Sequence, residues 1–189
     1  MNTKQKSEKQ NIRKFLIDRR NELSLKYEAR NNSHIHIKTL LEDIGKCRVG
    51  SYFPFRNEIS TKPIHELLFS LGFEISLPCI NDKDKNLTFR NWEINDDLKK
   101  NKYGILQPRE NTIDDCPGMI IVPLVGFSVS GYRLGYGGGY YDRYLNKYLK
   151  DRQNILTIGI AFSFQKFNKL PITNKDMKLN YILTEKGIF

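Results

Sequence analysis

Residues 119–145, MIIVPLVGFSVSGYRLGYGGGYYDRYL, indicate the fold of this chain. The apolar run at the start of the segment is typical of a strand buried on both faces of a parallel sheet. Five glycines follow within nine residues, at positions 131, 135 and 137–139, and a helix is predicted over 139–150. Because these glycines lie between a buried strand and a helix, they predict a ligand-binding loop beyond the carboxyl end of that strand.

Strands and helices alternate on both sides of this segment. The predicted strands cover residues 49–53, 73–77, 87–92, 119–124, 155–162 and 180–184. The predicted helices cover residues 8–28 and 33–44, a stretch from Thr61 to Gly72, and residues 139–150. This alternation predicts one α/β domain over residues 1–189, with three layers, α/β/α, around a mainly parallel central sheet. Segment 81–118 is expected to be irregular, except for a short strand or hairpin at residues 87–92.

The predicted helix 8–28 is strongly basic. The first 30 residues hold nine Lys or Arg against four Asp or Glu, which is half of the net charge of +10. On a helix, Ile12, Phe15, Leu16 and Leu23 share one face, with Lys9 and Arg13 together at its edge. The helix is therefore expected to pack on the domain and to carry a basic edge that attracts anions. A nucleic acid, an anionic membrane, a small polyanion or simply solvent would all suit such an edge.

Composition excludes several classes of protein. With 39% hydrophobic and 12% aromatic residues among 189, the chain is neither disordered nor collagen-like. No apolar run approaches the ~20 residues of a membrane-spanning helix, and the charged N-terminal segment lacks the apolar core of a secretory signal. Three widely spaced cysteines form no CxxC pair, which argues against a disulfide framework or structural zinc. We therefore expect a cytoplasmic protein.

The glycine-rich segment matches neither of the common phosphate-binding motifs. It contains no GxxxxGK followed by Ser or Thr, and GxGxxG fails because Tyr140 or Asp142 stands where the third glycine is needed. A Walker-type NTPase and a Rossmann dehydrogenase are therefore not supported. A merely permissive loop remains an alternative, although Arg133, Tyr141 and Arg143 frame the glycines with polar side chains.

Residues 133–145, RLGYGGGYYDRYL, closely resemble the sequence signature of the 5-formyltetrahydrofolate cyclo-ligases, also called methenyltetrahydrofolate synthetases. Segments 9–20, 52–61, 120–127 and 170–185 resemble other parts of the family in the same order. The resemblance implies an enzyme that uses ATP and Mg²⁺ to convert 5-formyltetrahydrofolate into 5,10-methenyltetrahydrofolate, with release of ADP and phosphate. In this family the formyl oxygen is phosphorylated, N10 attacks the activated carbon, and phosphate leaves.

The resemblance also implies individual site residues. ATP would contact Lys9, Arg13, Arg133, Leu134, Gly135, Tyr136, Gly137, Gly138, Gly139, Tyr140 and Tyr141. The folate would contact Phe53, Glu58, Tyr136, Gly137, Gly138, Gly139 and Tyr140. Arg133 and Tyr140 would take part in catalysis, and Asp142 and Asp176 would bind Mg²⁺. An ordinary loop acid remains the alternative for Glu58, and a first-turn helix acid for Asp142.

Two positions depart from the family pattern. Ser128 stands where many members have Asp, and Gly138 stands where many have Lys. Glycine in place of lysine at position 138 removes one positive charge. Lys9, Arg13 and Arg133 are therefore the expected phosphate-binding cations. The single Trp92 is expected in the core or at an interface, with stacking on a folate ring as the alternative.

The expected partners are folate and ATP, with no membrane and no nucleic acid, and a monomer is expected. Two other functions stay open: a folate-binding relative without turnover, and a basic RNA-binding protein. The presence of Asp142 and Asp176 argues against the first. The absence of an RNP or KH pattern argues against the second.

Overall fold

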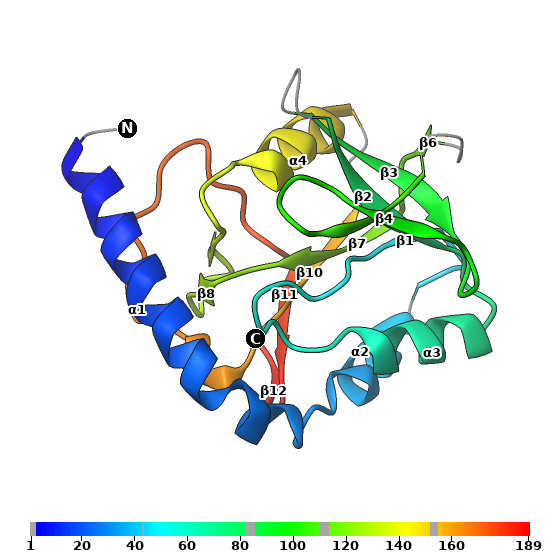
Figure 1. Ribbon diagram of the computed structural model, residues 1–189, viewed down its shortest axis with the longest axis horizontal. Helices are drawn as coiled ribbons and strands as arrows, with labels where there is room; N and C mark the ends of the chain where they lie inside the picture. Colours follow the sequence, from blue (N-terminus) through cyan, green and yellow to red (C-terminus); the bar gives the residue numbers. More distant parts are fainter. Residues whose placement is uncertain (1–2, 43, 82–85, 110–113, 152–154) are drawn as a thin grey trace.

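An eight-stranded sheet forms the centre of the molecule, with the order β12-β11-β10-β7-β1-β2-β3-β6 (Figure 1). The structure is a computed structural model that describes residues 3–42, 44–81, 86–109, 114–151 and 155–189. The sheet strands are β1 (Val49–Gly50), β2 (Ile75–Asn81), β3 (Asn86–Trp92), β6 (Asp114–Asp115), β7 (Met119–Pro123), β10 (Leu156–Ile160), β11 (Tyr181–Thr184) and β12 (Gly187–Ile188). Strands β2, β1, β7, β10 and β11 pair in parallel, and only the outer pairs are antiparallel. The predicted mainly parallel sheet is confirmed.

Helices cover both faces of this sheet (Figure 1). On one face lie α2 (Ser33–Leu41) and α3 (Lys62–Ser70), where Leu68 packs in a cluster with Ile121. On the other face lies α4 (Tyr140–Asp151), where Leu145 packs in a cluster with Ile120 and Val122. Neighbouring residues of β7 thus point to opposite faces, as the period of a strand requires, and both faces are buried. The predicted three-layer α/β/α architecture is confirmed.

The longest helix, α1 (Thr3–Glu28), lies along the side of the molecule next to the segment that follows β7 (Figure 1). Its buried face consists of Lys9, Ile12, Leu16, Arg20 and Ser24. Ile12 and Leu16 pack with Val125, just beyond β7. Phe15 was expected on this face but is 53% exposed, because the face is centred on Leu16 and Arg20 instead. No helix within the described ranges is long and apolar enough to cross a membrane.

Several element boundaries differ from the predicted ones. Helix α2 ends at Leu41, ahead of Gly45, and the predicted strand 49–53 is reduced to the two residues of β1. Segment 81–118 is more regular than expected, because it holds β3, the hairpin of β4 (Leu98–Lys100) with β5 (Leu106–Pro108), and β6. Two further short strands, β8 (Gly126–Phe127) and β9 (Arg133–Leu134), pair beyond β7, and the 3₁₀ helix η1 (Ser163–Gln165) lies beside them.

Candidate active site

The glycine-rich loop runs from β9 to α4, and Arg13 of α1 lies against it. The Arg13 Nε donates a hydrogen bond to the Gly135 carbonyl oxygen at 2.7 Å. Gly137 has a φ of +105°, and a Cβ there would lie 3.4 Å from the guanidinium carbon of Arg13. Glycine at this position therefore allows both the backbone conformation and the close approach of the cation. Leu134, at the start of the loop, is buried in a small cluster with Ile12 and Leu16.

Lys9 binds a carboxylate that is distant in sequence. Its Nζ lies 2.8 Å and 2.6 Å from the two carboxylate oxygens of Asp176, and the side chains are 7% and 20% exposed. Asp176 also accepts hydrogen bonds from the backbone N–H and the hydroxyl of Thr173. Burial alone would raise the pKa of Asp176, but the bonds from Lys9 and Thr173 outweigh it and lower the pKa. Asp176 is therefore held as an anion beside α1.

A second ion pair joins Arg133 of β9 to Asp142 in the first turn of α4. The Arg133 Nη2 lies 2.9 Å from Oδ1 of Asp142, and the side chains are 3% and 29% exposed. Asp142 also accepts a bond from the backbone N–H of Met177, whose carbonyl oxygen accepts one from Arg133. Because Met177 directly follows Asp176, the two predicted metal-binding carboxylates belong to one connected cluster.

The donor chemistry of this cluster fits Mg²⁺. Within the described ranges, no three His, Cys, Asp or Glu side chains gather as a complete set of metal ligands. Asp142 and Asp176 nevertheless supply hard carboxylate oxygens. Magnesium in nucleotide-dependent enzymes is typically held by one or two carboxylates together with phosphate oxygens and water. In this structure Lys9 and Arg133 engage these two carboxylates and balance their negative charges.

Glu58 lies in a buried hydrogen-bond network with the glycine-rich loop. It is 8% exposed; its Oε1 accepts a bond from the Tyr136 hydroxyl at 2.9 Å, and its Oε2 accepts one from the Phe55 backbone N–H at 2.9 Å. The Tyr136 hydroxyl accepts a hydrogen bond from Arg20 of α1. Burial raises the pKa of Glu58 to about 7, although the Arg20 charge and these hydrogen bonds act in the opposite direction. Two residues predicted to contact folate, Glu58 and Tyr136, are thus in direct contact.

Phe53 occupies a different environment from Glu58. Its ring centroid lies 5.2 Å from that of Trp92 and 5.7 Å from that of His65, in an aromatic cluster near α3. Trp92 is 5% exposed and belongs to the core, as expected. The neighbouring Phe55 instead has its ring centroid 6.0 Å from that of Tyr136, beside Glu58.

Tyr140 begins α4 and closes the glycine-rich loop. Its hydroxyl lies 3.2 Å from that of Tyr103, in the hairpin between β4 and β5, and Arg143 lies over its ring. A Cβ on Gly138 would meet the Tyr140 ring at 2.6 Å. The departure at Gly138 is therefore coupled to the position of Tyr140, because a larger residue would force this ring to move.

The sequence model of the 5-formyltetrahydrofolate cyclo-ligase family matches residues 5–185. The chain belongs to this family of enzymes. It is 30% identical over 162 residues to the 5-formyltetrahydrofolate cyclo-ligase of Haemophilus influenzae, covering 83% of this chain and 86% of that protein. It is 31% identical over 146 residues to the cyclo-ligase of Escherichia coli K12, covering 75% of this chain and 79% of that one.

Solved structures of cyclo-ligases share the fold. The 5,10-methenyltetrahydrofolate synthetase of Aquifex aeolicus matches with a TM-score of 0.70 and 28% identity, over 95% of this chain and 91% of that one. The enzyme of the same name from Mycoplasma pneumoniae matches with a TM-score of 0.69 and 28% identity, over 94% and 98% of the two chains.

The sequence analysis of this cyclo-ligase missed Arg20 and Phe55. A signal for Arg20 was present, because a residue eleven positions after Lys9 and seven after Arg13 shares their helix face.

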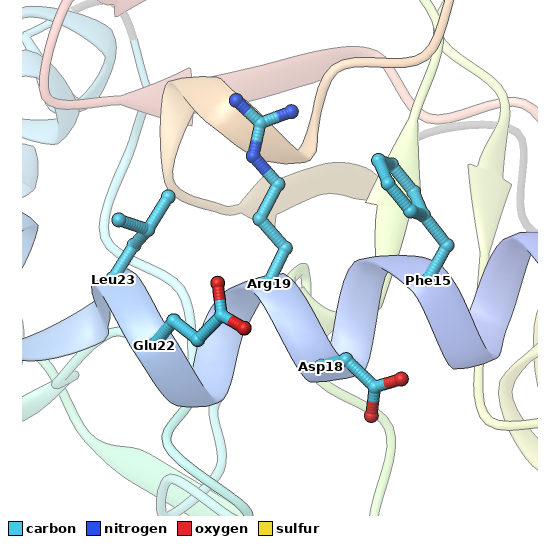
Figure 2. Close-up of a pocket in the computed structure, with 5 residues that line it drawn as sticks. All are labelled: Phe15, Asp18, Arg19, Glu22 and Leu23. Atoms are coloured by element: carbon cyan, nitrogen blue, oxygen red, sulfur yellow. The ribbon is translucent and has the colours of Figure 1, made fainter.

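A shallow hollow on another face of α1 is lined by Phe15, Asp18, Arg19, Glu22 and Leu23 (Figure 2). None of the residues predicted for the cyclo-ligase site lines this hollow.

Proposed function

We propose that this protein converts 5-formyltetrahydrofolate into 5,10-methenyltetrahydrofolate with ATP and Mg²⁺, releasing ADP and phosphate. One observation carries the proposal: the glycine-rich loop binds Arg13 through Gly135 and binds Glu58 through Tyr136. Gly135 contacts a cation and the next residue, Tyr136, contacts a carboxylate, so the loop has a cationic side and a carboxylate side next to each other. Two different ligands that react together must be held side by side in this way.

The cationic side would hold ATP. Lys9, Arg13 and Arg133 supply the charges, and residues 134–141 supply backbone N–H groups at the start of α4, where negative charge is stabilised. Phosphates in this position would attract Lys9 and Arg133 away from their carboxylates. Asp142 and Asp176 would then be available to hold Mg²⁺, which when bound supplies positive charge to the phosphate oxygens.

The carboxylate side would hold the folate. An ionised Glu58 accepts hydrogen bonds, so it suits the N–H donors along the edge of a pterin ring. Tyr136 orients this carboxylate, and the ring of Phe55 supplies apolar surface beside it. Tyr140 would add a folate contact through the family resemblance. The family resemblance adds Phe53 to the proposed folate contacts. Phe53 comes from the same segment as Phe55 and Glu58, and its ring packs against Trp92.

The proposed chemistry converts a poor leaving group into a good one. The formyl oxygen attacks the γ-phosphorus of ATP, and the bond from that phosphorus to ADP breaks. The N10 lone pair then attacks the activated carbon, N10 loses its proton to solvent, and the C–O bond breaks to release phosphate. Arg133 and Tyr140, on either side of the glycines, would orient the two ligands and stabilise the charge that develops on the transferred group.

Incubation of the protein with 5-formyltetrahydrofolate, ATP and Mg²⁺ tests the proposal, because the methenyl product has its own ultraviolet absorption. We expect the product to accumulate, and omission of ATP or Mg²⁺ to abolish it. Folate binding without turnover would support the non-catalytic alternative. Steeply salt-dependent RNA binding without folate binding would support the RNA-binding alternative. We also propose a monomer, which gel filtration can test.

A further inference from the structure

A buried arginine lies next to the Glu58–Tyr136 pair. Arg20 is 1% exposed, on the inner face of α1. Its Nη2 donates to the Tyr136 hydroxyl, its Nη1 donates to the Leu124 carbonyl oxygen at 3.4 Å, and its guanidinium carbon lies 5.6 Å from the centre of the Tyr136 ring. Arg20 thus connects α1, the segment after β7 and the glycine-rich loop.

The charge of Arg20 faces the carboxylate of Glu58 through one shared hydroxyl. Tyr136 accepts a hydrogen bond from Arg20 and donates to Glu58 at 2.9 Å, with the Phe55 carbonyl oxygen as a longer second acceptor at 3.3 Å. Its hydroxyl therefore lies between the two charges. A buried cation without an anionic partner is strongly destabilising, and so is a buried carboxylate without a cation. The burial of both groups around Tyr136 is therefore explained if each balances the charge of the other.

We propose that Arg20 is a positioning residue of the folate site: it holds the Tyr136 hydroxyl against Glu58 and favours the ionised carboxylate that accepts hydrogen bonds from the pterin ring. This inference rests on the proposed function, because it takes Glu58 as the folate-binding carboxylate. It assigns to α1 a role at the folate side in addition to its basic contacts at the nucleotide side.

The chemical reason is the protonation state of Glu58. A protonated carboxyl group becomes a donor and loses part of its accepting capacity, so it suits the pterin donors less well. Burial raises the pKa of Glu58 to about 7, and the Arg20 charge is the main influence that lowers it. Without that charge, Glu58 would keep its proton to a higher pH.

The other groups that face Glu58 do not titrate near neutral pH. They are the hydroxyls of Tyr52, Tyr136 and Tyr141, which come from the segment after β1, the glycine-rich loop and α4. Burial raises the pKa of each of these tyrosines above its ordinary value, so they remain neutral. A change in folate affinity around neutral pH therefore reports on Glu58.

The experiment measures the dissociation constant of 5-formyltetrahydrofolate between pH 6 and 9 for the wild type, Arg20→Gln and Arg19→Gln. Arg19 is the matched control, because it is the exposed arginine next to Arg20 on the same helix. We expect Arg20→Gln to raise the pH midpoint of binding by about one unit and therefore to weaken folate binding about fivefold at pH 7. Its ATP affinity should stay close to that of the wild type, and Arg19→Gln should match the wild type throughout.

A folded Arg20→Gln protein with an unchanged pH midpoint would overturn the inference. If this variant does not fold, Tyr136→Phe replaces it, since it removes the shared hydroxyl and leaves both charges in place. Loss of the hydrogen bond to the ionised carboxylate should then weaken folate binding and raise the midpoint. An unchanged midpoint in Tyr136→Phe would likewise contradict the inference.

Failure of the inference and failure of the proposed function give different results. A wild-type protein that does not bind 5-formyltetrahydrofolate contradicts the proposed function. A wild type that binds it, with loss of affinity in Glu58→Gln but no pH shift in Arg20→Gln, contradicts the role of Arg20 alone.

Discussion

The cations near the glycine-rich loop differ in what their removal would leave behind. Lys9 and Arg133 each neutralise a carboxylate, so their removal leaves a partly buried anion unpaired. Arg13 instead donates from Nε to a backbone carbonyl. Substitution of Arg13 therefore disturbs the folded protein least and tests the nucleotide side most directly.

Arg13→Ala should weaken ATP binding while leaving folate binding nearly unchanged. Loss of one charge-assisted hydrogen bond to a phosphate is expected to cost roughly 1.5–3 kcal/mol of binding free energy. Calorimetric titration with each ligand measures the two affinities, and Lys14→Ala, at the exposed neighbouring position of α1, is the control. An ATP affinity equal to that of the wild type would exclude Arg13 from the nucleotide site.

Glu58 should make the stability of the folded protein depend on pH. Its pKa is raised from the ordinary value of 4.5 to about 7 by burial, so the folded state binds more protons than the unfolded state between these values. Its contribution to stability is complete below the lower value and is lost as the pH rises through the higher one. Relative to Glu58→Gln, the wild type should lose about 3 kcal/mol of unfolding free energy between pH 4 and pH 8.

Urea denaturation of the wild type and Glu58→Gln at pH 4, 6 and 8 measures this difference. Two stability curves that stay parallel over that range would show that Glu58 titrates normally in the folded protein. In that case the carboxylate would be better solvated than its buried position indicates.

At the scale of elements, the docking of α1 decides whether the site exists. The helix contributes Lys9, Arg13 and Arg20, and its position depends on close packing against β8. A Cβ on Gly126 would lie 2.4 Å from Cδ1 of Leu16 and 3.3 Å from the carbonyl oxygen of Gln165 in η1. Gly126 therefore lets α1 approach the segment that follows β7.

Gly126→Ala should destabilise the protein by roughly 1–3 kcal/mol, because Leu16 is fully buried and has no room to move away. Thermal or urea unfolding measures the loss. Gly45→Ala is the control, since a Cβ at Gly45 meets no atom within 4 Å. Leu16→Ala should cost less stability in the Gly126→Ala background than in the wild type, because the clash is relieved, and purely additive effects would show that the two residues do not interact.

At the scale of the whole molecule, the nucleotide side of the site joins three regions of the chain. Lys9 lies 167 residues from Asp176, and Arg13 lies 122 residues from Gly135. The loop before α4 contacts α1 through Gly135 and Arg13, and the first turn of α4 contacts the turn at residues 173–177 through Asp142 and Met177. Correct global folding is therefore needed before any one of these side chains reaches its partner.

Asp142→Asn should lower turnover steeply and raise the Mg²⁺ concentration that turnover needs. Asparagine is tolerated in the first turn of α4, but Arg133 would lose its anionic partner, so we also expect a loss of roughly 1–3 kcal/mol in stability. Turnover against Mg²⁺ concentration is measured at a temperature where the variant is folded. Glu66→Gln, an exposed acid on α3, is the control. Normal turnover of Asp142→Asn at low Mg²⁺ would contradict the metal assignment.

Local patterns in the sequence were sufficient for the architecture and the family. The apolar run of β7, the alternation of strands with amphipathic helices and residues 133–145 each lie within one short segment, so they predicted the three-layer fold and the cyclo-ligase resemblance. The two-residue strands β8, β9 and β12 escaped prediction because two residues carry no periodicity. The predicted face of α1 was correct for Ile12 and Leu16, but Phe15 is exposed, and Lys9, expected at the edge, lies within the buried face.

Only the tertiary structure decided which partners these residues have. The burial of Arg20 in place of Phe15 depends on what the segment after β7 and the glycine-rich loop present to α1, and no pattern within α1 contains that information. The pairing of Lys9 with Asp176 and of Arg133 with Asp142 likewise arises when distant segments meet. The physical reason is that hydrophobic periodicity acts over a few residues, whereas the cost of burying a charge is settled by whatever group lies opposite it in the folded protein.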